Sequence, residues 1–204
     1  MRPDWLVDLV ERLAMAAPDH FQRFELPEGK GARQSAVLLL FAHGDDGIEL
    51  VVTRRSSELA HHSGQVAFPG GGLDADEDAA SAALREAIEE VGLRIESAEV
   101  VLELPPLWLP VSENLVTPVV AWWHTPHELY VGDPREVDLV RRVSLEQLAD
   151  PVNRVRVRHS SGRLFPAFLI DELVVWGFTG GIIDALLQLL ALERDWDRSR
   201  VVEL

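Results

Sequence analysis

The chain has no cysteine, and its basic side chains are outnumbered by acidic ones. Without a thiol, the sequence excludes a disulfide framework, a thiolate metal site and a cysteine nucleophile. Lys and Arg total 19 against 34 Asp and Glu, for a formal net charge of −15. A general nucleic-acid-binding protein relies on basic side chains that contact the phosphates. The excess of acidic residues therefore argues against that class of protein.

Long apolar runs are also missing, because no stretch reaches the length that spans a membrane. The first 13 residues place Asp4, Asp8 and Glu11 among apolar side chains, which excludes the apolar core of a signal peptide. The same spacing predicts an amphipathic helix over about residues 3–15. We therefore expect a cytoplasmic protein with neither a membrane nor a nucleic acid as its partner.

The length of 204 residues suits one domain spanning 1–204, with a core over about 35–190. Apolar and β-branched runs predict strands over 35–42, 48–54, 99–104, 115–123, 154–158 and 163–170. Helices are expected over 78–91, 143–149 and 182–192, with a loop over 55–70. This order predicts an α/β (α+β) sandwich with a mixed sheet. The apolar terminal helices either cover the core or form the face of a homodimer.

The segment from Gly71 to Leu93 carries the strongest chemical signal of the chain. Its apolar residues recur at helical spacing, and Gly92 suits the position just after a helix end. Acidic residues gather where this helix begins, at the end of the helix dipole that favours negative charge: Asp74, Asp76, Glu77 and Asp78.

Three glutamates mark the polar face of that helix. Glu86 and Glu90 are four residues apart and therefore share a face, and Glu89 flanks them. Crowded carboxylates repel one another, and a hard divalent cation such as Mg²⁺ or Mn²⁺ relieves the repulsion. Alone, such a run usually forms only a solvated helix face. The glycine-rich stretch Phe68–Gly72 before it favours the metal interpretation, since its backbone allows a ligand to approach closely.

The spacing of these residues resembles the Nudix box, G-x5-E-x7-R-E-U-x-E-E-x-G-U. Ala87, at a bulky aliphatic position, is the one soft departure. The chain is thereby identified as a member of the Nudix hydrolase family, with its α/β/α sandwich and metal-dependent chemistry. The resemblance implies that Glu86 and Glu90 are the main metal ligands and that Glu89 completes the cluster or acts through a bound water. It implies positioning roles for Arg85 and Glu77, and it suggests Glu136 as a loop carboxylate that assists catalysis.

A second resemblance concerns residues 50–71, just before the box. They are similar to the motif of the coenzyme A pyrophosphatase branch, L-L-T-x-R-S-x3-R-x-H-x-G-Q-x3-F-P-G-G. The branch cleaves coenzyme A or acyl-CoA to 3′,5′-ADP and 4′-phosphopantetheine. Two departures put the substrate in doubt, Ala60 at the second arginine of the motif and Glu113-Asn114 where glycine is expected. The resemblance suggests substrate contacts from Arg54, Arg55, Gln65, Gly70 and Gly71.

Other interpretations stay open. Because of the departures at Ala60 and Glu113, a Nudix hydrolase that acts on ADP-ribose or a nucleotide sugar is an alternative. A module that senses a nucleotide without cleaving it is weaker, because such modules usually lose box carboxylates. Either Arg54 or Arg55 can point to solvent, and His62 and Gln65 can serve only to organise the loop. The tryptophans at 108, 122 and 123 favour buried packing over stacking on a base.

Overall fold

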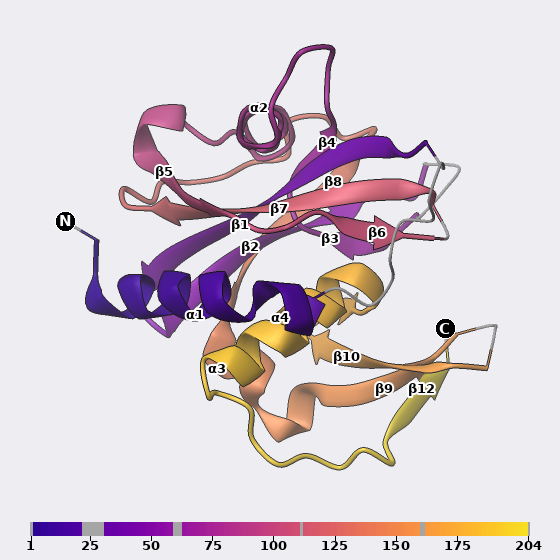
Figure 1. Cartoon of the computed structure of the whole chain (residues 1–204). Helices are drawn as coiled ribbons and strands as arrows, with labels where there is room; N and C mark the ends of the chain where they lie inside the picture. The colour runs from indigo at the N-terminus through magenta and orange to yellow at the C-terminus, as the bar shows by residue number, and fades with distance from the viewer. Residues whose placement is uncertain (1, 22–30, 59–62, 111, 160–161, 204) are drawn as a thin grey trace.

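The computed structural model describes residues 2–21, 31–58, 63–110, 112–159 and 162–203 (Figure 1). Its helices are α1 (Asp4–Phe21), α2 (Ala79–Val91), α3 (Leu145–Ala149) and α4 (Gly177–Leu189), with 3-10 turns at Ile95–Ser97 and Pro151–Asn153. The first strands are β1 (Arg33–Gly44), β2 (Gly47–Arg55), β3 (Val66–Ala67), β4 (Gly70–Gly72), β5 (Ala98–Glu103) and β6 (Leu107–Leu109). The later ones are β7 (Asn114–Trp123), β8 (Val137–Ser144), β9 (Arg154–Arg158), β10 (Leu164–Ile170), β11 (Leu173–Val175) and β12 (Val201–Glu203).

The larger sheet is mixed and has the order β3-β2-β1-β7-β5, with β4 on β1, β6 on β7 and β8 on β2. β1 runs parallel to β7 and antiparallel to β2. The two central strands are apolar on both faces, with Leu38 and Leu40 in one hydrophobic cluster and Leu39 and Phe41 in the other. A strand buried on both faces needs cover on each side.

Helices supply that cover (Figure 1). α2 packs on one face through small buried residues, Ala82, Ala83 and Ala87. On the opposite face lie α1, α3 and α4, which bury Leu6, Leu9, Leu13, Leu145, Leu148 and Leu186 in the second cluster. The predicted α/β/α sandwich with a mixed sheet is therefore confirmed.

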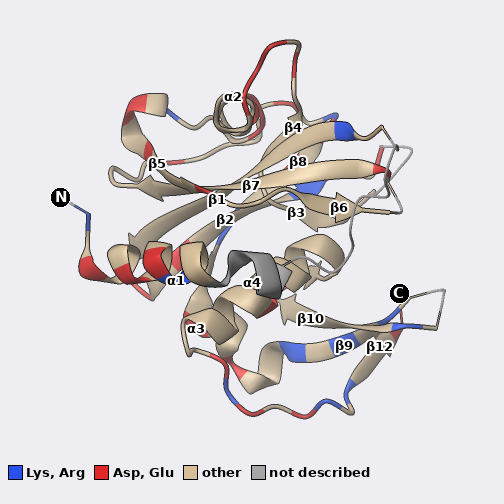
Figure 2. Cartoon of the chain, in the orientation of Figure 1, with Lys and Arg blue, Asp and Glu red and all other residues tan. Residues whose placement is uncertain are grey.

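A second sheet, in the order β11-β10-β9-β12, lies beyond α4 (Figure 1). Figure 2 shows acidic residues along α1 and in the loop before α2, whereas arginines line β9. Residues 201–203 form β12, which pairs in parallel with β9. Among the described residues, no helix is both long and apolar enough to cross a membrane.

Several predicted bounds are wrong. α1 extends to Phe21, beyond the expected end at residue 15. Val143 and Ser144 end a strand that the sequence did not indicate, β8, and Ser144 caps α3 by accepting a hydrogen bond from the amide of Gln147. The glycine-rich stretch, expected as a loop, contributes β4, which pairs with residues 35–37 of β1.

The last helix also differs from its prediction. α4 begins at Gly177, five residues before the expected start, and ends at Leu189. Glycine is a poor helix former, so this start depends on packing. A Cβ atom at Gly180 would lie 3.1 Å from the carbonyl oxygen of Val175 and 3.3 Å from that of Pro166. Glycine thus lets the first turn of α4 approach β10 and β11 closely.

Candidate active site

Helix α2 has the ends that the sequence predicts. The Asp78 side chain accepts a hydrogen bond from the amide of Ser81, which caps the first turn. Gly92 ends the helix with a φ of 68°, in the left-handed region. These two caps fix where the helix begins and ends. Within it, Glu86 and Glu90 lie one turn apart on the same face.

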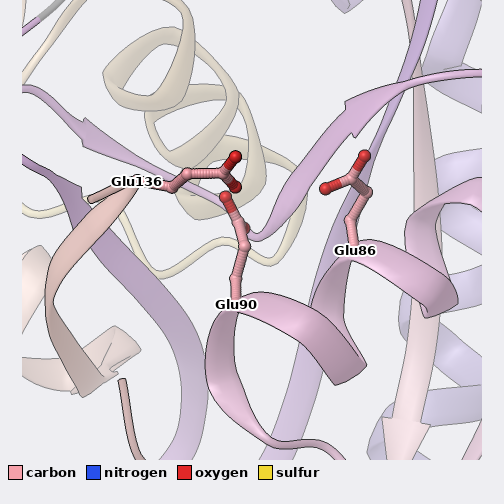
Figure 3. A group of neighbouring side chains, drawn as sticks. All are labelled: Glu86, Glu90 and Glu136. Carbon is pink, nitrogen blue, oxygen red and sulfur yellow. The ribbon is translucent and has the colours of Figure 1, made fainter. Parts of the chain in front are cut away.

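Three carboxylates converge above this face (Figure 3). Glu86 and Glu90 come from α2, and Glu136 comes from the turn just before β8. One oxygen from each lies within 4.8 Å of the others. Glu90 is buried, Glu86 is partly buried and Glu136 is exposed, so the group has a closed side and an open side. Such an all-oxygen set suits a hard divalent cation.

The glycine-rich stretch closes one side of the group. The amide of Gly70 donates a hydrogen bond to Oε2 of Glu90, at 3.0 Å. A Cβ atom at Gly71 would lie 2.2 Å from Oε1 of Glu86. Glycine at this position therefore leaves the space that the Glu86 carboxylate occupies.

Arg85 holds the other side. Its Nε and Nη2 donate to the two oxygens of Glu77, each at 3.0 Å, and its Nη1 donates to Glu86 Oε1 at 2.9 Å. Nη2 also donates to the carbonyl oxygen of Gly72, at 3.0 Å. Glu77 in turn accepts from the amide of Asp74. The guanidinium thus ties α2 to the glycine-rich stretch.

Glu89 is not part of the converging group. Its side chain is 59% exposed, against 14% for Glu86, and its nearest charged partner is Nη1 of Arg85, at 3.5 Å. Among the described carboxylates, Glu136 is the third member of the converging group, and Glu89, which the resemblance expects to complete the cluster or to act through a bound water, lies beside it.

Burial changes the acidity of the two helix carboxylates. Burial, more than any other cause, raises the pKa of Glu90 to about 7, and the hydrogen bond from Gly70 opposes this only in part. Burial likewise raises the pKa of Glu86, against the hydrogen bond from Arg85. Hydrogen bonds from Arg85 lower the pKa of Glu77. Negative charge is thus unfavourable at the group unless a cation joins it.

The turn that carries Glu136 is fixed to the end of α2. The amides of Tyr130 and Gly132 donate to the carbonyl oxygens of Val91 and Glu90, at 3.2 and 2.9 Å. A Cβ atom at Gly132 would lie only 1.7 Å from the carbonyl oxygen of Glu89. The role of Gly132 was missed, because the spacing of the sequence does not show that this loop returns to the helix.

Backbone bonds then fix Glu136 itself. Its amide donates to the carbonyl oxygen of Asp133, and its own carbonyl oxygen accepts from the amide of Ser56. Ser56 directly follows Arg55 at the end of β2. Glu136 is therefore held between the end of α2 and the end of β2.

The two arginines at the end of β2 have different surroundings. Arg54 Nε pairs with Asp138 Oδ1 at 2.7 Å. Burial raises the pKa of Glu90, and the charge of Arg55 opposes that rise only in part. The buried Nε of Arg55 has no hydrogen-bond partner among the described residues. The backbone carbonyl oxygen of Gln65 accepts a hydrogen bond from the backbone amide of Arg55. Ala60, His61 and His62 lie outside the described residues.

The tryptophans do not line this group. Trp108 and Trp123 are buried, and Trp123 donates its indole N–H to Ser97. Trp122 packs edge-on against Trp5. Buried packing, the simpler interpretation, is thus confirmed for Trp108 and Trp123.

The raised pKa of Glu90 predicts how the stability of the metal-free protein depends on pH. A carboxyl group whose pKa is higher in the folded state stabilises that state below the unfolded pKa, and the gain is lost as pH rises through the folded pKa. The free energy of unfolding should therefore fall by about 3 kcal/mol between about pH 4.5 and about pH 7, because each pKa unit of the shift corresponds to about 1.4 kcal/mol. Urea denaturation in chelator at pH 5 and pH 8 measures this.

The matched variants are Glu90→Gln and Glu89→Gln. Glutamine at position 90 can still accept from Gly70, so we expect it to remove most of the fall, whereas the variant at position 89 keeps it. The same pH dependence in Glu90→Gln and in the unmodified protein would contradict this origin.

Comparison with known proteins agrees with the geometry. The NUDIX domain family matches residues 32–168. The chain is 37% identical over 191 residues to the uncharacterized Nudix hydrolase NudL of Escherichia coli (strain K12), covering 87% of this chain and 96% of that protein. It is 33% identical over 169 residues to Nudix hydrolase 15, mitochondrial, of Arabidopsis thaliana, covering 77% of this chain but only 58% of the plant protein.

Solved structures share the fold. The Nudix hydrolase RenU of M. smegmatis superimposes with a TM-score of 0.55 at 22% identity, covering 83% of this chain and 92% of its own. A MutT/nudix family protein from Enterococcus faecalis gives a TM-score of 0.54 at 16% identity, covering 94% and 75%. At such identities the likeness concerns the fold alone.

Proposed function

The chain belongs to the Nudix family and is a Nudix pyrophosphohydrolase, and from this premise we propose that it cleaves coenzyme A or acyl-CoA to 3′,5′-ADP and 4′-phosphopantetheine. One observation carries the reaction, the convergence of Glu86, Glu90 and Glu136 beside a glycine-rich stretch. The substrate rests on the residue pattern of 50–71. A cytoplasmic location and a homodimer stay predictions from the sequence.

The carboxylate group fits the divalent cation, Mg²⁺ or Mn²⁺, that this chemistry needs. Its oxygens are close together, and two of its members have raised pKa values without a cation. We assign Glu86 and Glu90 as the main ligands and Glu136 as the third. A bound cation of this kind lowers the pKa of water and neutralises charge that develops on phosphate oxygens.

The surrounding residues position the metal ligands and contact the substrate. Arg85 keeps Glu86 in place through its bonds to Glu77 and Glu86. Arg55, whose Nε has no hydrogen-bond partner among the residues that the structure describes, binds a phosphate oxygen of the substrate. Glu89 acts from outside the ligand group, through a water molecule. Gly70 and Gly71 let the pyrophosphate approach the ligands closely.

The rival substrates are ADP-ribose and nucleotide sugars. They share the pyrophosphate, so the carboxylate group serves them equally well, and Ala60 removes one charged contact expected of the coenzyme A branch. A sensing module without hydrolysis is disfavoured because each box carboxylate is present and Glu86 and Glu90 converge with Glu136.

A substrate panel tests the proposal. At equal concentrations with Mg²⁺, we expect kcat/KM for coenzyme A or an acyl-CoA to exceed that for ADP-ribose, NADH, dinucleoside polyphosphates and nucleoside triphosphates. The reason is that residues 50–71 resemble the motif of the coenzyme A pyrophosphatase branch, and only the coenzyme A derivatives in the panel contain 4′-phosphopantetheine. A clear preference for any other member of the panel would overturn the substrate assignment and leave the hydrolase intact.

A further inference from the structure

A pocket of about 300 Å³ lies between the smaller sheet and the segment that follows α4. Strands β9 and β10, the C-terminal half of α4 and residues 193–198 line it. The converging carboxylates lie elsewhere, on α2 and on the turn before β8, and α2 and α4 cover opposite faces of the larger sheet (Figure 1). The pocket is therefore separate from the candidate active site.

Three arginines line this pocket, although the chain as a whole has a net charge of −15. Arg154 has a side chain that is only 1% exposed, and its Nη2 pairs with Asp184 of α4. Arg156 forms no ion pair with a described carboxylate, and its Nη1 donates only a long hydrogen bond, of 3.5 Å, to the carbonyl oxygen of Arg198. Arg198 is 70% exposed and has Glu193 at 3.5 Å. Three guanidinium groups thus face two carboxylates, which leaves an excess of positive charge.

Two buried donors in the same lining have no acceptor. Nε of Arg154 and the indole Nε1 of Trp196 make no hydrogen bond with the residues that the structure describes. They belong to one stack, because Cζ of Arg154 lies 4.6 Å from the ring centre of Phe168 and 4.7 Å from that of Trp196. A buried N–H without an acceptor costs free energy, and an oxyanion that enters the pocket offers the missing acceptor.

The charges indicate which oxyanion fits. A guanidinium donates two parallel hydrogen bonds to a phosphate or a carboxylate. Arg156 has no carboxylate partner among the described residues, and Arg198 has one only at 3.5 Å, so two guanidinium groups are open to a ligand. Two such groups suit the double charge of a phosphate better than the single charge of a carboxylate. The volume, at the low end for small-molecule sites, suits a small ligand.

We propose that this pocket binds the phosphate group of a small ligand, with Arg156 as its main contact and with Arg198 and Trp196 on the C-terminal side. Arg154, held by Asp184, adds its buried charge. Residues 184–198 lie beyond the region 32–168 that matches the NUDIX domain family, so the family match does not include this side of the pocket. The proposal is independent of the substrate that the carboxylate group cleaves.

A titration of the full-length chain with inorganic phosphate tests the proposal. The protein is kept free of divalent cations, so that phosphate does not bind at the carboxylate group through a metal, and at about pH 8, where phosphate carries two charges. In ¹⁵N-labelled protein, the indole N–H of Trp196 is assigned with Trp196→Phe and followed while phosphate replaces chloride at constant ionic strength. We expect a saturable shift of this signal.

Arginine variants show whether the pocket causes the shift. Arg156→Gln should weaken the affinity at least about tenfold, because it removes a charge-assisted hydrogen bond. Arg198→Gln, at a side chain that is 70% exposed, should weaken it without affecting the fold. Arg158→Gln is the matched control, since Arg158 lies two residues further along β9, pairs with Glu203 at 3.0 Å and does not line the pocket. The amide spectrum verifies the fold of each variant.

Two further ligands identify the chemistry. Tighter binding of glycerol 3-phosphate than of phosphate would identify a phosphate monoester as the ligand, and weaker binding would identify the free ion; either result supports the phosphate site. The proposal is overturned by the absence of a saturable shift in the unmodified protein, by unchanged affinity in Arg156→Gln, by an equal loss in Arg158→Gln, or by acetate that binds as tightly as phosphate.

Discussion

Replacing Glu90 by glutamine should lower kcat for Mg²⁺-dependent hydrolysis by at least about a thousandfold, since metal stabilisation of developing charge contributes several kcal/mol and each tenfold is about 1.4 kcal/mol. Glutamine has nearly the same shape and can still accept from the amide of Gly70, so the loss reports the missing charge rather than a changed fold. Steady-state kinetics at saturating Mg²⁺ measure the effect, and circular dichroism verifies the fold.

Glu89→Gln is the matched control, one residue earlier on the same helix. Because Glu89 is 59% exposed and outside the converging group, we expect a smaller loss of about a hundredfold, the low end for a group that acts through a water molecule. Near-normal turnover in Glu90→Gln, or a loss of kcat in Glu89→Gln as large as that in Glu90→Gln, would refute the ligand assignment.

The second large effect concerns Gly132. A Cβ atom there would meet the carbonyl oxygen of Glu89 at 1.7 Å, and a helix backbone cannot move aside as a side chain can. Gly132→Ala should therefore displace the turn that carries Glu136 and lower kcat about a hundredfold, the loss that follows a misplacement of about 1 Å. The apparent affinity for Mn²⁺, followed by electron paramagnetic resonance, should weaken together with kcat.

Two further variants show whether Gly132 acts through Glu136. Gly31→Ala adds the same methyl group at a glycine with open space around it, and it should leave kcat unchanged. If displacement of Glu136 is the cause, Gly132→Ala should cost little more in a Glu136→Gln background. Additive losses in the double variant would show instead that Gly132 matters only for the fold of the loop.

The sequence predicts the half of the site that lies on one helix. The period of an α-helix places Glu86 and Glu90 on one face, and the cap residues that fix the helix, Asp78 and Gly92, are local signals. Glu136 lies far along the chain, and only the family resemblance suggested it. The contacts that place it, through Gly132 and Ser56, depend on the assembled fold and leave no pattern in the sequence.

The missed elements have similar explanations. β8 carries Arg141 and Arg142, which obscure its apolar residues, and the partners of these arginines, Glu172 and Glu49, are remote in sequence. α4 begins in a glycine-rich stretch whose low helix propensity is overcome by close packing on β10 and β11. Local propensity indicates the helices and central strands well, but not elements that form through distant partners.

Incubation with coenzyme A, once with Mg²⁺ and again with excess chelator, shows whether the chain is a metal-dependent pyrophosphohydrolase of this substrate. We expect equal amounts of 3′,5′-ADP and 4′-phosphopantetheine with Mg²⁺ and neither product with chelator. Cleavage that persists in chelator, or products from breakage of any bond other than the pyrophosphate, would contradict it.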